Sequence, residues 1–155
     1  MIIVRLKGGL GNQMFQYALG NVLSIKNNTD LKLDISFFDF KFRNITKRNY
    51  DLDVFNIKAK IVKKNKITAY LAFLFRKIIR MRGQERNFKF DPNILSLSPD
   101  VYLNGYWQSP KYFEDFEDVI RKDFTLKNQP AQNILNLANE ILNTNSICIH
   151  VRRGD

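Results

Sequence analysis

The sequence ends in a group of side chains that can bind an anion. Residues 147–151, ICIHV, are apolar enough for a buried β-strand. Arg152, Arg153 and Asp155 follow at the carboxyl end of this predicted strand. Two adjacent guanidinium groups form a fork that matches phosphate oxygens, and His150 shares a strand face with Arg152 because side chains alternate. We therefore predict a phosphate-binding element here; the alternative is a surface loop in which the carboxylate neutralises one arginine.

A glycine-rich turn near the start of the chain is the second candidate site. Residues 7–13, KGGLGNQ, lie between a β-rich run and a helical pattern. Gly9 and Gly11 let the backbone approach a ligand, and the amino end of a helix favours negative charge. The segment lacks the lysine of a P-loop and the third glycine of a dinucleotide fingerprint. We predict that the amides of Asn12 and Gln13 bond ligand hydroxyls; the alternative is a structural turn with Asn12 as helix cap.

The third candidate combines an aromatic ring with amide side chains. Trp107 is the one tryptophan of the sequence, and Gln108 follows it. A pyranose has an apolar face that packs on an aromatic ring and a rim of hydroxyls that can bond amides. Trp107 and Gln108 are therefore predicted to bind a sugar acceptor; the alternative is a core aromatic beneath a turn.

The composition indicates an ordinary globular domain with a strong positive charge. The chain has 155 residues, 45% of them hydrophobic, and a formal net charge of +10. Such a charge attracts nucleic acid, acidic lipids or nucleotide phosphates, or serves solubility alone. The single cysteine, Cys148, lies in the apolar run at 147–151 and is predicted to be buried. One cysteine and one histidine cannot form a zinc site, and no metal or other cofactor is expected.

The hydrophobic periodicity predicts an α/β domain with a parallel sheet. A strand, a glycine turn, a helix and a second strand open the chain, which is the usual start of such a domain. The predicted helix at 66–82 has a basic end that suits a membrane surface, although a core-facing helix is the alternative. The expected strands are 2–6, 31–37, one beginning at 101, and 147–151; the expected helices are 14–25, 66–82, 111–124 and 131–143.

Four motifs together resemble the α-1,2-fucosyltransferases of glycosyltransferase family 11. They are KGGLGNQMFQYALG near the start, KRNYDLDVF at 47–55, GYWQSPKYF at 105–113, and IHVRRGD at the end, in the order and rough spacing of that family. The resemblance implies a GT-B-type glycosyltransferase with two Rossmann-like domains. It places a Rossmann-like, acceptor-side domain at 1–145 and the first strand of a GDP-fucose-binding domain at 146–155, so the chain is expected to be an amino-terminal fragment, inactive alone.

The resemblance also implies a reaction and roles for residues. The reaction is inverting transfer of L-fucose from GDP-β-L-fucose to the 2-hydroxyl of a galactoside, without a metal. The resemblance names no base; Asp34 and Asp39 are candidates from their place near the end of a predicted strand. The implied catalytic residues are Arg152 and Asn12. The implied donor-binding residues are His150, Arg152, Arg153, Asp155, Gly9, Gly11 and Asn12. The implied acceptor-binding residues are Trp107 and Gln108.

The partners follow from the same resemblance, whereas the location is expected from the lack of a signal-peptide pattern at the start of the sequence and from the basic helix predicted at 66–82. The expected partners are GDP-fucose and a glycan acceptor, with no nucleic acid, in a cytoplasmic protein that touches the inner membrane face peripherally. The alternative function is a basic nucleic-acid-binding module, which rests on the charge of +10 and on aromatic residues among lysines. No nucleic-acid-binding motif supports it, and the basic residues are spread along the chain.

Overall fold

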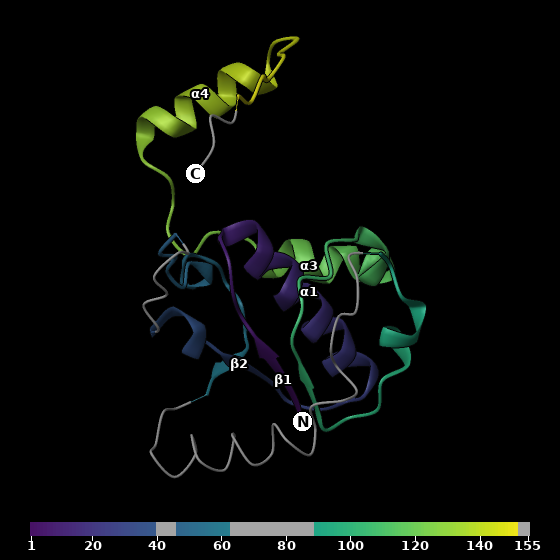
Figure 1. The fold of residues 1–155 in the computed structure, drawn as a ribbon. Coiled ribbons are helices and arrows are strands. Elements are labelled where there is room, and N and C mark those ends of the chain that lie inside the picture. Colours follow the sequence, from purple (N-terminus) through teal and green to yellow (C-terminus); the bar gives the residue numbers. More distant parts are fainter. Residues whose placement is uncertain (40–45, 63–88, 152–155) are drawn as a thin grey trace.

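A four-stranded parallel sheet forms the centre of the protein. The computed structural model describes residues 1–39, 46–62 and 89–151. The strands are β1 (Ile2–Arg5), β2 (Leu31–Asp34), β3 (Lys60–Ile61) and β4 (Val101–Leu103), in the order β3-β2-β1-β4, and all three pairings are parallel. The predicted α/β class, Rossmann-like, is thereby confirmed (Figure 1).

One face of the sheet packs against the helix α1 (Leu10–Lys26). The side chains of β1 alternate, and Ile2 and Val4 are fully buried. Tyr17, Leu19 and Leu23 bring the buried stripe of α1 into the same core. Because apolar residues recur at helical spacing over 14–25, the sequence predicted this helix correctly.

Gly20 is the point of closest approach between α1 and the sheet. A Cβ built at Gly20 would lie 2.4 Å from Val4 Cγ2 and 3.0 Å from Leu31 Cδ1. We expect Gly20→Ala to lower the free energy of unfolding by about 1–2 kcal/mol, since overpacking outweighs the better helix propensity of alanine. Urea denaturation followed by circular dichroism measures this loss. A more stable Gly20→Ala variant would show that helix and sheet are less tightly packed than described here.

A second helix, α3 (Glu117–Asp123), lies beside α1 (Figure 1). The buried carboxylate of Asp123 joins the two helices. Tyr17 Oη and Asn21 Nδ2 donate to Asp123 Oδ2 over 2.8 and 2.7 Å. Burial, together with this bond to Asp123, raises the pKa of Tyr17 far above its ordinary value. The tyrosine therefore stays neutral and works as a structural donor.

The single helix predicted at 111–124 is wrong in its first half. Two short 3-10 turns, Pro110–Tyr112 and Glu114–Phe116, precede α3. Phe113 leaves helical geometry, with φ −144° and ψ 12°. Its ring packs on Phe15 of α1 with centroids 5.8 Å apart. Packing of aromatic side chains against α1 thus replaces a continuous helix.

The second predicted strand is shorter than 31–37. It ends at Asp34, whose Oδ1 accepts a hydrogen bond from the backbone N–H of Ser36 over 2.8 Å. This aspartate turn directs the chain into the 3-10 helix Ser36–Asp39. The prediction extended the strand because Ile35 and Phe37 continue the apolar alternation, and it missed the turn at Asp34.

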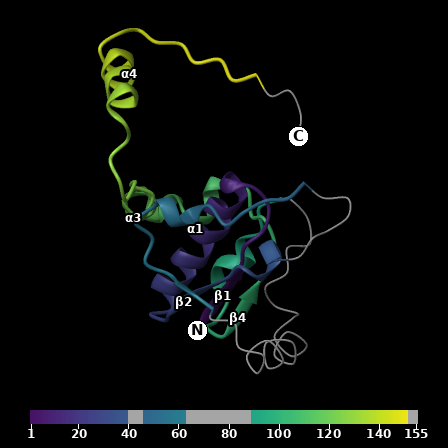
Figure 2. The ribbon, with the colours of Figure 1, turned by 90° about the vertical axis from the view of Figure 1, so that its left-hand side faces the viewer.

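The last described part of the chain differs most from expectation. The predicted helix at 131–143 is confirmed as α4 (Gln132–Leu142), which lies apart from the sheet in both views (Figures 1 and 2). The strand predicted at 147–151 is not formed, and Ile147 is 90% exposed. Cys148 is exposed as well, so the prediction of a buried cysteine is wrong. A strand needs a neighbour for its backbone groups, and no described strand pairs with this segment.

The predicted helix at 66–82 lies outside the described residues.

Candidate functional site

The carboxyl ends of β1 and β4 mark the point where ligands bind in open α/β sheets. β2 and β3 lie on one side of β1 and β4 lies on the other, so the strand order reverses beside β1. Ligands bind at such a switch point, outside the carboxyl ends of the strands. Residues 7–12, called the glycine turn from here on, follow β1 and include the first residues of α1. Residues 104–109 follow β4. The sheet thus brings the second and third predicted sites to the same edge.

Asn12 and Gln108 connect the two segments directly. Gln108 Nε2 donates a short hydrogen bond to Asn12 Oδ1, between residues 96 positions apart. Lys7 Nζ lies 4.4 Å from the centroid of the Tyr106 ring, a cation–π contact between the same segments. Asn12 is not the helix cap, because Gly9 occupies that position. Asn12 and Gln108 are therefore side by side at the switch point, as a shared site requires.

Gln13 does not have the role expected from the sequence. Its side chain is fully buried, and the carboxamide bonds the backbone at Gly8, Asn49 and Asp51. Gln16 is equally buried and bonds both backbone groups of Lys7. Neither amide is offered to a ligand, so the prediction that Gln13 bonds ligand hydroxyls is wrong. Its spacing to the buried Gln16, Tyr17 and Gly20 is the helical signal that would have placed Gln13 on the inward face.

Trp107 is a core residue rather than a sugar platform. Its side chain is 1% exposed and belongs to the main hydrophobic cluster. A buried ring offers no face to a pyranose, so its predicted acceptor-binding role is not supported. The backbone at Trp107 has φ +46°, which a residue with a side chain seldom adopts. Gln108, which follows it, is exposed. Of the two residues predicted to bind the sugar acceptor, only Gln108 has a side chain that can face a ligand.

Asp34 is held as an anion and is poorly suited to act as a base. Burial would raise its pKa, but hydrogen bonds from Tyr102 and Ser36 and the charge of Arg5 outweigh burial and lower the pKa below its ordinary value. The Tyr102 hydroxyl donates to Asp34 Oδ2 over 2.6 Å, and the Ser36 N–H donates to Asp34 Oδ1. Asp39 is exposed at the end of its 3-10 helix. Asp34 instead ties β2 to β1 and β4.

The bond between Tyr102 and Asp34 makes stability depend on pH. A lowered pKa in the folded state stabilises the fold above the unfolded pKa, and this contribution is lost as pH falls through the folded value. We expect Tyr102→Phe to cost about 1 kcal/mol near pH 7, where the carboxylate loses a donor. The deficit should shrink below about pH 4, where the carboxyl is protonated in the unfolded chain. Urea denaturation at several pH values tests this, and a deficit that does not change with pH would contradict it.

The family of the chain follows from comparison with known proteins. The sequence profile described as "Glycosyl transferase family 11" matches residues 1–155, the whole chain. The chain belongs to glycosyl transferase family 11. The resemblance drawn from the four motifs is thereby confirmed.

Two curated relatives of this family 11 chain come from Escherichia coli. One, named "Alpha-1,2-colitosyltransferase", is 32% identical over 167 residues, which cover 100% of this chain and 55% of the relative. The other, named "O-antigen biosynthesis glycosyltransferase WbnK", is 27% identical over 179 residues, which cover 97% of this chain and 58% of the relative. The chain thus spans somewhat more than half the length of these relatives. No solved structure matches it.

The phosphate-binding element predicted for this family 11 chain is described only in part. His150 is exposed, in the segment that follows α4. Arg152, Arg153 and Asp155 lie outside the described residues, so their binding of the donor stays a prediction. The structure brings together the glycine turn and Gln108, but it does not show the arginines.

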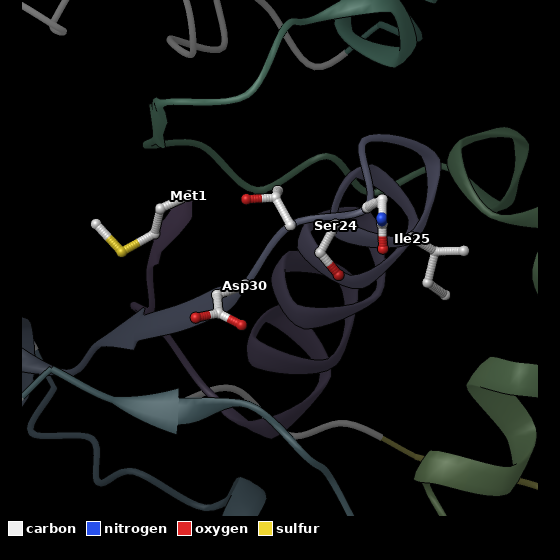
Figure 3. A pocket seen from close by; sticks show the side chains of 6 residues that line it. Met1, Ser24, Ile25 and Asp30 are labelled. Carbon is white, nitrogen blue, oxygen red and sulfur yellow. The ribbon is translucent and has the colours of Figure 1, made fainter.

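The opposite edge of the sheet carries a hollow that is separate from these residues. It has a volume of about 630 Å³ and is open to solvent. Figure 3 shows Met1 and Asp30 at the starts of neighbouring strands, and Ser24 and Ile25 at the end of α1. The amino group of Met1 also pairs with Asp100 over 2.8 Å. The hollow lies at the amino ends of the strands, away from the switch point.

The described residues contain neither a group of side chains that could hold a metal ion nor a helix that could span a membrane. Within residues 1–39, 46–62 and 89–151, no three acidic, histidine or cysteine side chains are grouped so that they could hold a metal ion. In the same ranges no helix is long and apolar enough to cross a membrane.

Proposed function

We propose that the transferase containing this segment moves L-fucose from GDP-β-L-fucose to the 2-hydroxyl of a galactoside, with inversion. The observation that carries the proposal is the match of family 11 to the whole chain. The relative named as an alpha-1,2-colitosyltransferase supports a 1,2-linkage. The position of Asn12 and Gln108 at the switch point supports a site in which donor and acceptor meet.

The same relative favours a second candidate donor. Colitose is L-fucose without its 3-hydroxyl group, so a GDP-colitose donor would differ from GDP-fucose at that position alone. Asn12 Oδ1 accepts from Gln108, and its Nδ2 hydrogens are therefore the ones offered to a ligand. A group that bonds the 3-hydroxyl would separate the two donors, because a site built to bond a hydroxyl rejects an analogue that lacks it.

The proposed mechanism places positive charge on the leaving diphosphate. When the bond from sugar to phosphate breaks, negative charge develops on the β-phosphate, and fixed cations there lower the barrier. Arg152 takes this role, with Arg153 assisting and Asp155 fixing the local shape. Arginine forks can neutralise this charge in place of a divalent ion, so we propose that the reaction needs no metal.

We also propose a two-domain, GT-B-type arrangement. Residues 1–145 form the acceptor-side domain, and residues 146–155 begin the domain that binds GDP-fucose. The greater length of the relatives and the exposed apolar side chains at 147–151 support this division. We propose a cytoplasmic location with peripheral contact to the inner membrane face.

Calorimetric titration of the transferase with GDP and with RNA tests the proposal. We expect GDP binding that Arg152→Ala weakens about 10- to 100-fold, as the loss of charge-assisted hydrogen bonds predicts. Asn12→Ala should weaken binding of GDP-fucose more than binding of GDP, if Asn12 touches the sugar. Binding of RNA that falls steeply with salt, without binding of GDP, would instead establish the nucleic-acid-binding module.

A further inference from the structure

Gln13 joins the glycine turn to the motif KRNYDLDVF at residues 47–55, here called the 47–55 segment. Gln13 Nε2 donates to the carbonyl of Gly8 over 3.1 Å and to that of Asn49 over 2.8 Å. Gln13 Oε1 accepts from the backbone N–H of Asp51 over 3.0 Å. One carboxamide thus uses both donor hydrogens and its oxygen on backbone groups of two separate segments.

The carboxyl-terminal part of the 47–55 segment is fixed independently of Gln13. Leu52 is fully buried in the core. The carbonyl of Val54 accepts from Lys127 N–H over 3.0 Å, and the N–H of Asn56 donates to Thr125 O over 2.9 Å. The rings of Phe55 and Phe124 pack with centroids 5.3 Å apart. Removal of the Gln13 carboxamide should therefore loosen residues 47–51, where Tyr50 keeps its packing on the core, and leave the rest of the segment in place.

Residues 47–51 border the turn that favours an anion. The carbonyls of Gly8 and Asn49 both accept from the same nitrogen, so the two backbones run within reach of one amide group. Lys47 and Arg48 directly precede Asn49, so two positively charged residues adjoin this contact in the sequence. Residues 47–51 would therefore line one side of a nucleotide sugar bound at the glycine turn.

We propose that Gln13 is a positioning residue that holds residues 47–51 as one wall of the donor site. Gln13 touches no ligand itself, because it is fully buried. By fixing the wall it sets the affinity for the donor. The inference rests on the proposed function for the identity of the donor, but the positioning of residues 47–51 can be measured without it.

The first test uses amide hydrogen exchange on the chain of residues 1–155. Gln13→Met keeps the length of the side chain, but its thioether donates nothing and is only a weak acceptor. We expect the Asp51 amide to exchange at least about tenfold faster, because its N–H loses the Gln13 Oε1 acceptor. Gln16→Met is the matched control, because Gln16 is an equally buried glutamine on the same helix and bonds Lys7. It should leave Asp51 protected; equal protection of Asp51 in Gln13→Met and in the unchanged chain would overturn the proposal.

The second test measures donor kinetics of the active transferase. Gln13→Glu should raise KM for the GDP-sugar about tenfold near pH 8 with a much smaller change in kcat. The ionised carboxylate still accepts from the Asp51 N–H but donates to neither carbonyl, so lowering the pH should restore KM, since a protonated glutamic acid again donates to one carbonyl. Asn27→Asp is the control for KM: its carboxylate likewise faces two carbonyl groups, those of Leu23 and Leu97, but at the far end of α1, so it should change KM less. An equal rise of KM in both variants, or a loss of kcat alone, would overturn the positioning role.

The two tests separate failure of this inference from failure of the proposed function. If the Asp51 amide loses protection but no GDP-sugar is used by the unchanged transferase, the proposed function is wrong and the wall belongs to another site. If the GDP-sugar is used and KM does not respond to Gln13→Glu, the donor-site role of the wall is wrong.

Discussion

Trp107→Ala is expected to lower the free energy of unfolding by about 3–5 kcal/mol, the range for removing a large aromatic side chain from a core. The ring is 1% exposed and packs with the residues that join β1, α1 and β4. Denaturation by urea, followed by circular dichroism, measures the loss. The same loss should occur without any sugar present, because the ring supports the fold.

Gln108→Ala is the control for the Trp107 prediction. Gln108 is exposed, so its removal should change stability by no more than about 0.5 kcal/mol. Acceptor affinity should nevertheless fall in this variant, since Asn12 loses its partner. If Trp107→Ala kept its stability and lost only acceptor binding, the ring would be a sugar platform after all.

Gly8→Ala is expected to disrupt both the fold and the site. Gly8 has φ +80°, and a Cβ there would lie 2.5 Å from Asn12 Nδ2. Strain in the backbone and displacement of Asn12 together should cost about 2–3 kcal/mol. Donor binding should weaken as well, because Asn12 can no longer keep its position beside Gln108. Thermal unfolding and titration with GDP-fucose measure the two effects.

Gly11→Ala separates the fold from the site. A Cβ at Gly11 has no described atom within 4 Å, and Gly11 lies inside α1. Because Gly11 is the second residue of α1 and not in its interior, alanine should change the stability by no more than about 0.5 kcal/mol. If the donor fills the open space at the turn, this folded variant should bind GDP-fucose more weakly. Unchanged binding in Gly11→Ala together with intact binding in Gly8→Ala would remove the donor from the glycine turn.

The sequence predicted those elements whose pattern is local. The helix α1 follows from apolar residues at helical spacing, and β1, β2 and β4 from β-rich runs beside turns. The parallel sheet follows from the alternation of strand and helix. The two-residue strand β3 is too short to carry a detectable pattern.

The errors concern residues whose environment is set by distant parts of the chain. Residues 147–151 have the composition of a buried strand, but a strand forms only where a neighbouring strand takes up its hydrogen bonds. Trp107 and Gln13 illustrate the same limit at the site. An aromatic beside an amide suits either a sugar or a core, and a glutamine after a glycine turn suits either a ligand or the backbone of residues 49–51. Only the packing of the fold decides between them.

Transfer from a GDP-sugar is the measurement that tests the central claim most directly. The transferase containing residues 1–155 would be incubated with GDP-β-L-fucose or GDP-colitose and a β-galactoside, and the product linkage determined by NMR. We predict an α-linked 6-deoxy sugar on the 2-hydroxyl of galactose, formed without added metal and lost in Arg152→Ala. Transfer to another hydroxyl, or no transfer from either donor while the protein remains folded, would contradict the assignment.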